Sequence, residues 1–217
     1  MEIDHVLIAV NDLAGAGRAL EARYGLSSLA GGRHPDWGTA NRIVPLGEAY
    51  LELVAVVDRT AAGESVFGRW VAAAASKTGR PLGWAVRTDD IDSLAQRLHL
   101  TVSGGSRVTA DGALLQWRSC GIEAAATEPS LPFFIEWANR TQLPGRVHVK
   151  HPAGPVGLSR VVIHGDAGRL ATWLHGQVLP VEVLPGEAEL AAIVLSRGED
   201  EIVLGAGARG FAEDTFG

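Results

Sequence analysis

The chain has 217 residues, of which 47% are hydrophobic and 20% are charged, and this balance excludes wholesale disorder. Its net charge is −6 and no run of Lys or Arg is longer than a pair, which argues against nucleic acid as the main partner. No apolar run approaches the ~20 residues that cross a bilayer, and the first residues lack the basic region of a signal peptide. With one cysteine, Cys120, and therefore no internal disulfide, we expect a cytoplasmic protein without a membrane partner.

The first predicted unit covers residues 1–60. Residues 2–9 alternate as a strand, Asp12 is a helix N-cap, and Leu13, Ala16 and Leu20 follow at helical spacing. Three further strand-like runs come next, "LSSLAG", "ANRIVPL" and "YLELVAV". The unit therefore reads β-α-β-β-β.

The same order of elements returns twice. An alanine-rich stretch at 64–76 predicts a helical insert, and residues 81–138 then repeat the plan, with Asp90 at the N-cap and "LTVSG", "ALLQWRSC" and "PFFIEWA" as strands. After a connecting loop at 141–157, rich in Pro and Gly, residues 158–217 give a third unit with Asp166 at its cap. We expect an α+β fold in which paired units over residues 1–140 form a cup-shaped mixed sheet, with the third, partial unit appended.

Two carboxylates interrupt hydrophobic strands at matching positions of the first two units. Glu52 shares a strand face with Tyr50 and Val54, and Glu136 shares one with Phe134, while the opposite faces are also apolar. A buried carboxylate needs a cation, a metal or a proton. The simpler explanation is that each Glu faces solvent on a half-exposed sheet, and that a lone His such as His5 is a hydrogen-bonded core residue.

Several motifs are similar to those of one family. The opening "DHVLIAVNDL", the piece "HPDWGTAN" at 34–41, and "PFFIEW" at 132–137 followed by His151-Pro152 resemble the glyoxalase-like branch of the vicinal oxygen chelate superfamily. The resemblance implies a cup that holds a divalent metal (Zn, Mn, Fe or Co) between His5, Glu52 and Glu136, with Glu136 or Glu52 doubling as the catalytic base. Gly83 occupies the usual fourth ligand position, seven residues before Asp90 as His5 is seven before Asp12, and glycine has no side chain to ligate.

The expected ligand is a small molecule. Candidate binding residues come from the Gly-containing loop, from the tryptophans of the strands and from the segment after the second unit: His34, Thr39, Asn41, Trp84, Trp117, Trp137 and His151. For each, a turn or a packing role is the plain alternative. The resemblance implies a lyase, isomerase or dioxygenase that polarises substrate oxygens. The alternative is a metal-free protein that binds or sequesters a small molecule in the same cup, and a homodimer and a monomer both remain open.

Overall fold

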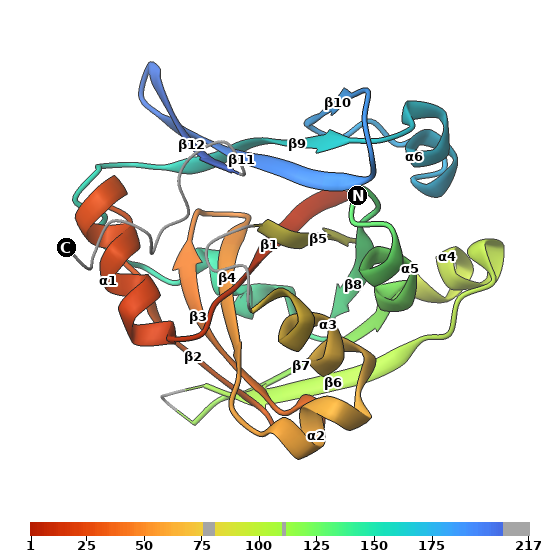
Figure 1. Cartoon of the computed structure of the whole chain (residues 1–217), viewed down its shortest axis with the longest axis horizontal. Helices are drawn as coiled ribbons and strands as arrows, with labels where there is room; N and C mark the ends of the chain where they lie inside the picture. The colour runs from red at the N-terminus through yellow and green to blue at the C-terminus, as the bar shows by residue number, and fades with distance from the viewer. Residues whose placement is uncertain (76–80, 110–111, 206–217) are drawn as a thin grey trace.

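The computed structural model describes residues 1–75, 81–109 and 112–205, and within them two sheets lie one above the other (Figure 1). The first unit supplies β1 (Glu2–Ala9), α1 (Leu13–Tyr24), β2 (Leu29–His34), β3 (Thr39–Pro45) and β4 (Tyr50–Val56). Helix α1 begins where Asp12 accepts a hydrogen bond from the backbone N–H of Ala14 at 3.0 Å, and it ends at Gly25, whose left-handed backbone favours glycine. This confirms the β-α-β-β-β plan of the first unit.

The second unit supplies β5 (Pro81–Arg87), α4 (Ile91–Leu98), β6 (Ser103–Val108), β7 (Leu114–Cys120) and β8 (Phe133–Trp137). A short helix that the sequence analysis did not predict, α5 (Ile122–Thr127), lies between β7 and β8. The eight strands form one sheet in the order β2-β3-β4-β1-β5-β8-β7-β6, and β1 and β5 are antiparallel neighbours at its centre. Each unit contributes one half with equivalent strand order, as expected of a duplicated unit.

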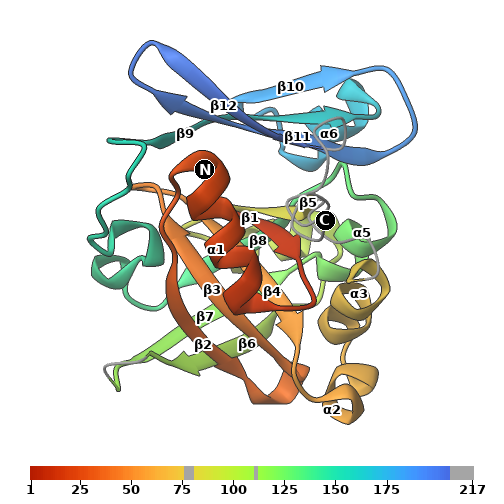
Figure 2. The same ribbon diagram turned by 60° about the vertical axis from the view of Figure 1, so that its left-hand side comes forward.

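The sheet curls until its two edge strands meet. Strands β2 and β6 contact each other, and the guanidinium of Arg107 on β6 donates a hydrogen bond to the carbonyl of Gly31 on β2. Figure 2 shows the β2–β3 and β6–β7 hairpins crossing at the same end of the molecule. The expected cup is therefore present, and it is nearly closed on itself.

The insert between the units forms two helices, where the sequence predicted one over 64–76. Helix α2 (Arg59–Glu64) is capped by Asp58, and α3 (Val66–Ala74) is capped by Ser65, whose hydroxyl accepts from the N–H of Gly68 at 2.9 Å. The last residue of the predicted insert, 76, lies outside the described residues. Helix α3 contacts β1, β4 and α5, so the insert covers one side of the cup.

The segment after β8 contains the 3₁₀ turns η2 (Arg140–Gln142) and η3 (Pro144–Arg146), and the third unit then begins at β9 (Gly157–His164). It continues through α6 (Ala167–Trp173), β10 (Val181–Leu184), β11 (Glu189–Arg197) and β12 (Asp200–Gly205), and the predicted residues 206–217 lie outside the described part. The predicted element order is confirmed, but the strand order, β10-β9-β11-β12, differs from that of the other units. In the first unit the first strand pairs in parallel with the last, whereas β9 pairs in parallel with β10, directly after its helix.

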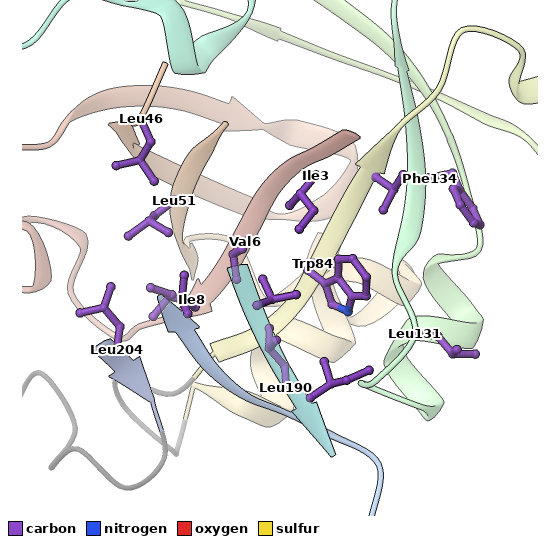
Figure 3. Close-up of a cluster of buried hydrophobic side chains, with 14 of the residues drawn as sticks. Ile3, Val6, Ile8, Leu46, Leu51, Trp84, Leu131, Phe134, Leu190 and Leu204 are labelled. Atoms are coloured by element: carbon purple, nitrogen blue, oxygen red, sulfur yellow. The ribbon is translucent and has the colours of Figure 1, made fainter. Parts of the chain in front are cut away.

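The second sheet covers the outer face of the eight-stranded sheet. Val6 and Trp84 from the two central strands lie in one cluster with Leu190 and Leu204 of the second sheet, as Figure 3 shows. These side chains are buried, and burial of this kind is the main force that holds the layers together. No helix among the described residues is long and apolar enough to span a membrane.

Candidate active site in the cup

His5 occupies the inner face of the cup through an irregularity in β1. The pairing of β1 with β5 shifts register between Ile3 and His5, so Asp4 lies at a bulge. Ile3 consequently packs in the core between the sheets, although simple alternation predicts that it shares a face with His5. The bulge also directs the carboxylate of Asp4 to His5, whose Nδ1 lies 2.7 Å from Asp4 Oδ1.

Asp4 is itself held by two other groups. Its Oδ2 accepts hydrogen bonds from Arg87 Nη1 at 3.1 Å and from the indole of Trp137 at 3.0 Å. Asp4 and Arg87 are both almost fully buried, so Asp4 is a buried carboxylate with a cationic partner. An Nδ1–H donated to such a carboxylate leaves Nε2 of His5 with a free lone pair.

Glu52 lies opposite this free nitrogen. Its Oε2 is 3.7 Å from His5 Nε2, and its Oε1 accepts from Asn41 Nδ2 at 2.8 Å. Glu52 reaches the cup because β4 alternates, with Tyr50, Glu52 and Val54 facing inward and Leu51 and Leu53 facing α1. The sequence-based expectation that Glu52 is a buried acid near His5 is therefore met by the geometry.

Two aromatic rings enclose the imidazole of His5. Tyr50 stacks on it with centroids 4.7 Å apart, and Phe133 meets it edge-on at 5.5 Å. Burial raises the pKa of Tyr50 well above its usual value, and the negative charges of Asp4 and Glu52 raise it further. Tyr50 is therefore a neutral phenol under ordinary conditions.

His34 and Thr39, both predicted from the "HPDWGTAN" motif, meet at the end of β2 and the start of β3. Nδ1 of His34 is 3.0 Å from the hydroxyl of Thr39. Burial lowers the pKa of His34, while the charge of Glu52 acts in the opposite direction. His34 is thus a neutral imidazole within the same cup as Asn41 and Glu52.

The space among these residues is small. A cavity of about 30 Å³ is lined by His5, His34, Asn41, Glu52 and Arg107 together with aromatic side chains. The aromatic side chains come from five elements: Trp37, Tyr50, Phe67, Trp117, Phe133 and Trp137. Such a volume holds on the order of one water molecule. The cup is therefore packed with aromatic rings around a polar centre.

A larger pocket of about 350 Å³ opens beside this cavity, at the mouth of the cup. Its walls are Leu29, Ile43 and Leu115 from the strands and residues 141–144, 146 and 147 from the segment after β8. Arg107 lines both the mouth pocket and the inner cavity, so it lies at the boundary between them.

Glu136 lies elsewhere, which corrects the expected ligand set. On β8, Phe133, Ile135 and Trp137 face the cup, so Glu136 points to the outer face, where its Oε2 accepts from Arg118 Nε at 3.0 Å. Its other oxygen accepts from the N–H of Ile91 at the start of α4 at 3.4 Å. The structure brings together His5 and Glu52 but not Glu136.

Gly83 faces the cup where the family pattern has its fourth ligand. A Cβ at this position would meet Cη2 of Trp70 at 2.3 Å, so the indole of α3 lies directly on the glycine. An aromatic ring from the insert therefore occupies the space that a ligand side chain at position 83 would need.

Two predicted binding residues have structural roles. Trp84 packs between the two sheets, where its indole N–H donates to the carbonyl of Ser130 at 3.3 Å. His151 bonds through both ring nitrogens to backbone groups, accepting from the N–H of Ser27 at 3.1 Å and lying 2.8 Å from the carbonyl of Pro45. Neither lines the inner cavity, whereas the predicted Trp117 and Trp137 do.

Sequence reasoning missed Asp4, Tyr50 and Arg107. The "DH" dipeptide before the first strand's apolar run was a usable signal for Asp4, because only a bulge buries two successive polar residues on one face. Tyr50 shares the alternation of Glu52 and could also have been selected. Arg107 gives no such signal, since it reaches the site only when the sheet closes.

Comparisons with known proteins agree with the duplicated cup. A family model described as a glyoxalase-like domain matches residues 3–178. The chain belongs to this glyoxalase-like family, within the vicinal oxygen chelate superfamily. No match was found among curated proteins.

Solved structures are similar to this glyoxalase-like chain to different degrees. A hypothetical protein from Staphylococcus aureus has a TM-score of 0.60 and 16% identity, covering 93% of this chain and 84% of that chain. A methylmalonyl-CoA epimerase from Mycobacterium tuberculosis has a TM-score of 0.43 and 20% identity, covering 63% of this chain and 86% of that chain.

The divalent metal that the glyoxalase-like resemblance implies can be tested against the donor set. Catalytic metal sites of this kind use about three protein ligands. His5 and Glu52 offer two donors, Glu136 is on the other face, and Gly83 offers none. The part of the chain that the structure describes contains no group of three or more His, Cys, Asp or Glu side chains arranged to hold a metal ion. The residues present therefore do not fit a resident catalytic metal.

Proposed function

We propose that this glyoxalase-like chain is a small-molecule enzyme of the isomerase or lyase type, in which His5 removes a proton from a carbon next to a carbonyl group. The observation that carries the proposal is the arrangement of His5, with Nδ1 at 2.7 Å from Asp4 and Nε2 directed into a nearly dry cavity. An imidazole oriented by a buried carboxylate is a common form of general base.

The charges around His5 favour the proton transfer. When Nε2 takes the proton, the imidazolium lies between the carboxylates of Asp4 and Glu52, and low polarity strengthens both attractions. Asn41 holds Glu52 in place through its amide. Glu52, predicted from the sequence as a metal ligand or base, is in this proposal the group that stabilises the protonated base.

The electron pair released from carbon needs a positive partner. The C–H bond breaks, its proton moves to Nε2, and the electron pair moves to the carbonyl oxygen as an enolate. Arg107 lines the same cavity and supplies the positive charge that stabilises this oxygen. Return of the proton to the opposite face of that carbon, or to another carbon of the enolate system, completes an isomerisation. Collapse of the enolate with departure of a group and its bonding electron pair from the neighbouring carbon completes a lyase reaction.

Hydrogen exchange tests this directly. The purified protein would be incubated in D₂O with 2-oxo acids, 3-oxo acids and short acyl thioesters, and deuterium at the α-carbon would be followed by proton NMR. We expect the wild type to accelerate exchange in at least one compound. His5→Gln should reduce the acceleration by about 10²-fold or more, the typical contribution of a general base. Glu52→Gln should also reduce it, because the protonated base then loses a negative partner.

Glu136→Gln is the matched control, because it makes the same chemical change on the outer face of the sheet. It should exchange like the wild type. Equal loss in Glu136→Gln and Glu52→Gln, or full activity in His5→Gln, would contradict the proposal.

A second candidate is a metal-free binding protein. The observation that favours it is the inner cavity of only about 30 Å³, which is lined by closely packed aromatic rings. The ring centroids of Trp117 and Trp137, for example, are 5.6 Å apart. Ligand-dependent quenching of tryptophan fluorescence without hydrogen exchange in any bound compound would favour this candidate.

A further inference from the structure

The pocket at the mouth of the cup has the size of a small-molecule site. Its volume of about 350 Å³ lies within the range of roughly 300–1,000 Å³ typical of ligand pockets. Most of its wall is hydrocarbon, from Leu29, Ile43, Leu115 and Leu143. The feature that distinguishes it from an apolar groove is Arg107, at its boundary with the inner cavity.

Arg107 is a buried cation, with only 6% of its surface exposed. Two glycines of β2 lie against it. The carbonyl of Gly31 accepts its hydrogen bond, and a Cβ on Gly32 would come within 3.3 Å of Arg107 Cδ. The side chain therefore crosses from β6 to the opposite edge of the sheet and lies along β2.

Arg107 forms no ion pair within 4.0 Å in the described ranges, whereas the other well-buried arginine, Arg87, pairs with Asp4. Glu52 lines the same inner cavity as Arg107 but does not come within that distance. A buried cation without an anion is costly, and a bound anion removes the cost. A carboxylate is the best match, because its two oxygens fit the planar guanidinium.

We propose that the mouth pocket binds a small monocarboxylic acid with an apolar body, its carboxylate on Arg107 and its hydrocarbon among Leu29, Ile43 and Leu143. A doubly charged phosphate is a poorer match, because Arg107 carries a single charge and Arg146, the other arginine of the lining, is already paired with Glu48. This binding mode rests on the proposed function for the identity of the substrate. In it, the carbon next to the carboxylate points toward the cavity that contains His5. Binding itself does not require proton transfer.

Arg146 provides a matched control. It also lines the mouth pocket, but its Nε and Nη2 each donate to the carboxylate of Glu48 at 2.8 Å, and its side chain is about half exposed. Its charge is already neutralised, so it should contribute little to the recognition of a carboxylate.

Calorimetric titration of the full chain tests the inference with a matched pair of probes, 4-methylpentanoate and 4-methylpentanamide, which differ only in charge and hydrogen bonding. Inorganic phosphate would be the third probe. We expect the acid to bind at least tenfold more tightly than the amide, and phosphate not to compete with it. Arg107→Met should weaken the acid at least tenfold, Arg107→Lys should weaken it less, and Arg146→Met should leave it within about twofold. Thermal unfolding of each variant would confirm that it is folded.

Equal affinity for acid and amide, unchanged binding in Arg107→Met, or no binding of the acid up to millimolar concentration would each overturn the inference. Loss of binding in Arg146→Met rather than Arg107→Met would do the same. His5→Gln separates this inference from the proposed function. If that variant and the wild type both bind the acid and neither catalyses hydrogen exchange, the proposed enzyme activity is contradicted, whereas the carboxylate site is supported.

Discussion

The indole of Trp70 lies directly on Gly83, the position where the resemblance to the glyoxalase-like branch predicted a fourth ligand. The two residues come from different parts of the chain, the insert helix α3 and the central strand β5. The ring of Trp70 fills the space that a side chain at 83 would need. The second half of the cup therefore contributes mainly aromatic rings together with Arg107, while His5 and Glu52 come from the first half.

Gly83→Ala should consequently destabilise the fold. The added methyl group would lie 2.3 Å from Cη2 and 2.6 Å from Cζ2 of Trp70, and Trp70 is itself buried. Overpacking of this kind costs about 1–3 kcal/mol of unfolding free energy, measurable by urea titration. Gly104→Ala is the control, because it lies in a strand with nothing within 4 Å of its Cβ. A Gly83→Ala protein as stable as Gly104→Ala would show that the ring of Trp70 moves aside without a loss of stability.

The buried network of Asp4 leads to a second prediction. Asp4→Asn removes the buried member of three carboxylates that pair with Arg87, whose side chain is only 2% exposed; the other two, Glu2 and Glu48, are exposed. A buried charge left wholly unpaired typically costs about 3–5 kcal/mol. Because Glu2 and Glu48 remain, the loss should be smaller than that, but denaturant unfolding should still detect it. Asp92→Asn, which weakens the exposed pair with Arg118, should change stability far less. Comparable losses in the two variants would contradict the buried-pair interpretation.

The strands show where sequence reasoning succeeds and where it fails. On β4, alternation correctly grouped Glu52 with Tyr50 and Val54, because the pleat alone decides the face. On β8, alternation also grouped Glu136 with Phe134, but it could not decide which face lined the cup, since both were apolar. That choice depends on packing against α4 and on Arg118, which lies directly opposite Glu136 on β7.

Features that depend on long-range closure were beyond the sequence. The duplicated units and the caps of α1, α4 and α6 follow from local pattern. Arg107 reaches Gly31 only because two edge strands 76 residues apart in sequence meet. The bulge at Asp4 likewise depends on how β5 pairs with β1, and no local pattern specifies that register.

Metal removal provides a third prediction. Because no three His, Cys, Asp or Glu side chains in the described ranges are arranged to hold a metal ion, dialysis against a chelator should leave both the hydrogen-exchange activity and the melting temperature unchanged. Added Zn²⁺ or Mn²⁺ should not raise the melting temperature. A metal that bound tightly to the native state alone would raise it, because such binding stabilises the native state. Stoichiometric metal in the purified protein that disappears in Glu52→Gln but persists in Glu136→Gln would refute this and restore a metal role for Glu52.

The buried imidazole of His34 makes stability depend on pH in a definite direction. Because burial lowers the pKa of His34 below its usual value of 6.5, the unfolded chain binds this proton more readily than the folded chain does. Stability should therefore fall as the pH decreases below about 6.5, toward the lower pKa of the folded state. Urea unfolding at pH 7.5 and pH 5.5 would measure the fall in the wild type, in His34→Gln and in His148→Gln, whose histidine is exposed. The fall should be smaller in His34→Gln than in the other two proteins, because that variant lacks the buried titrating group. An identical fall in all three proteins would show that protonation of His34 does not cause the loss of stability at low pH.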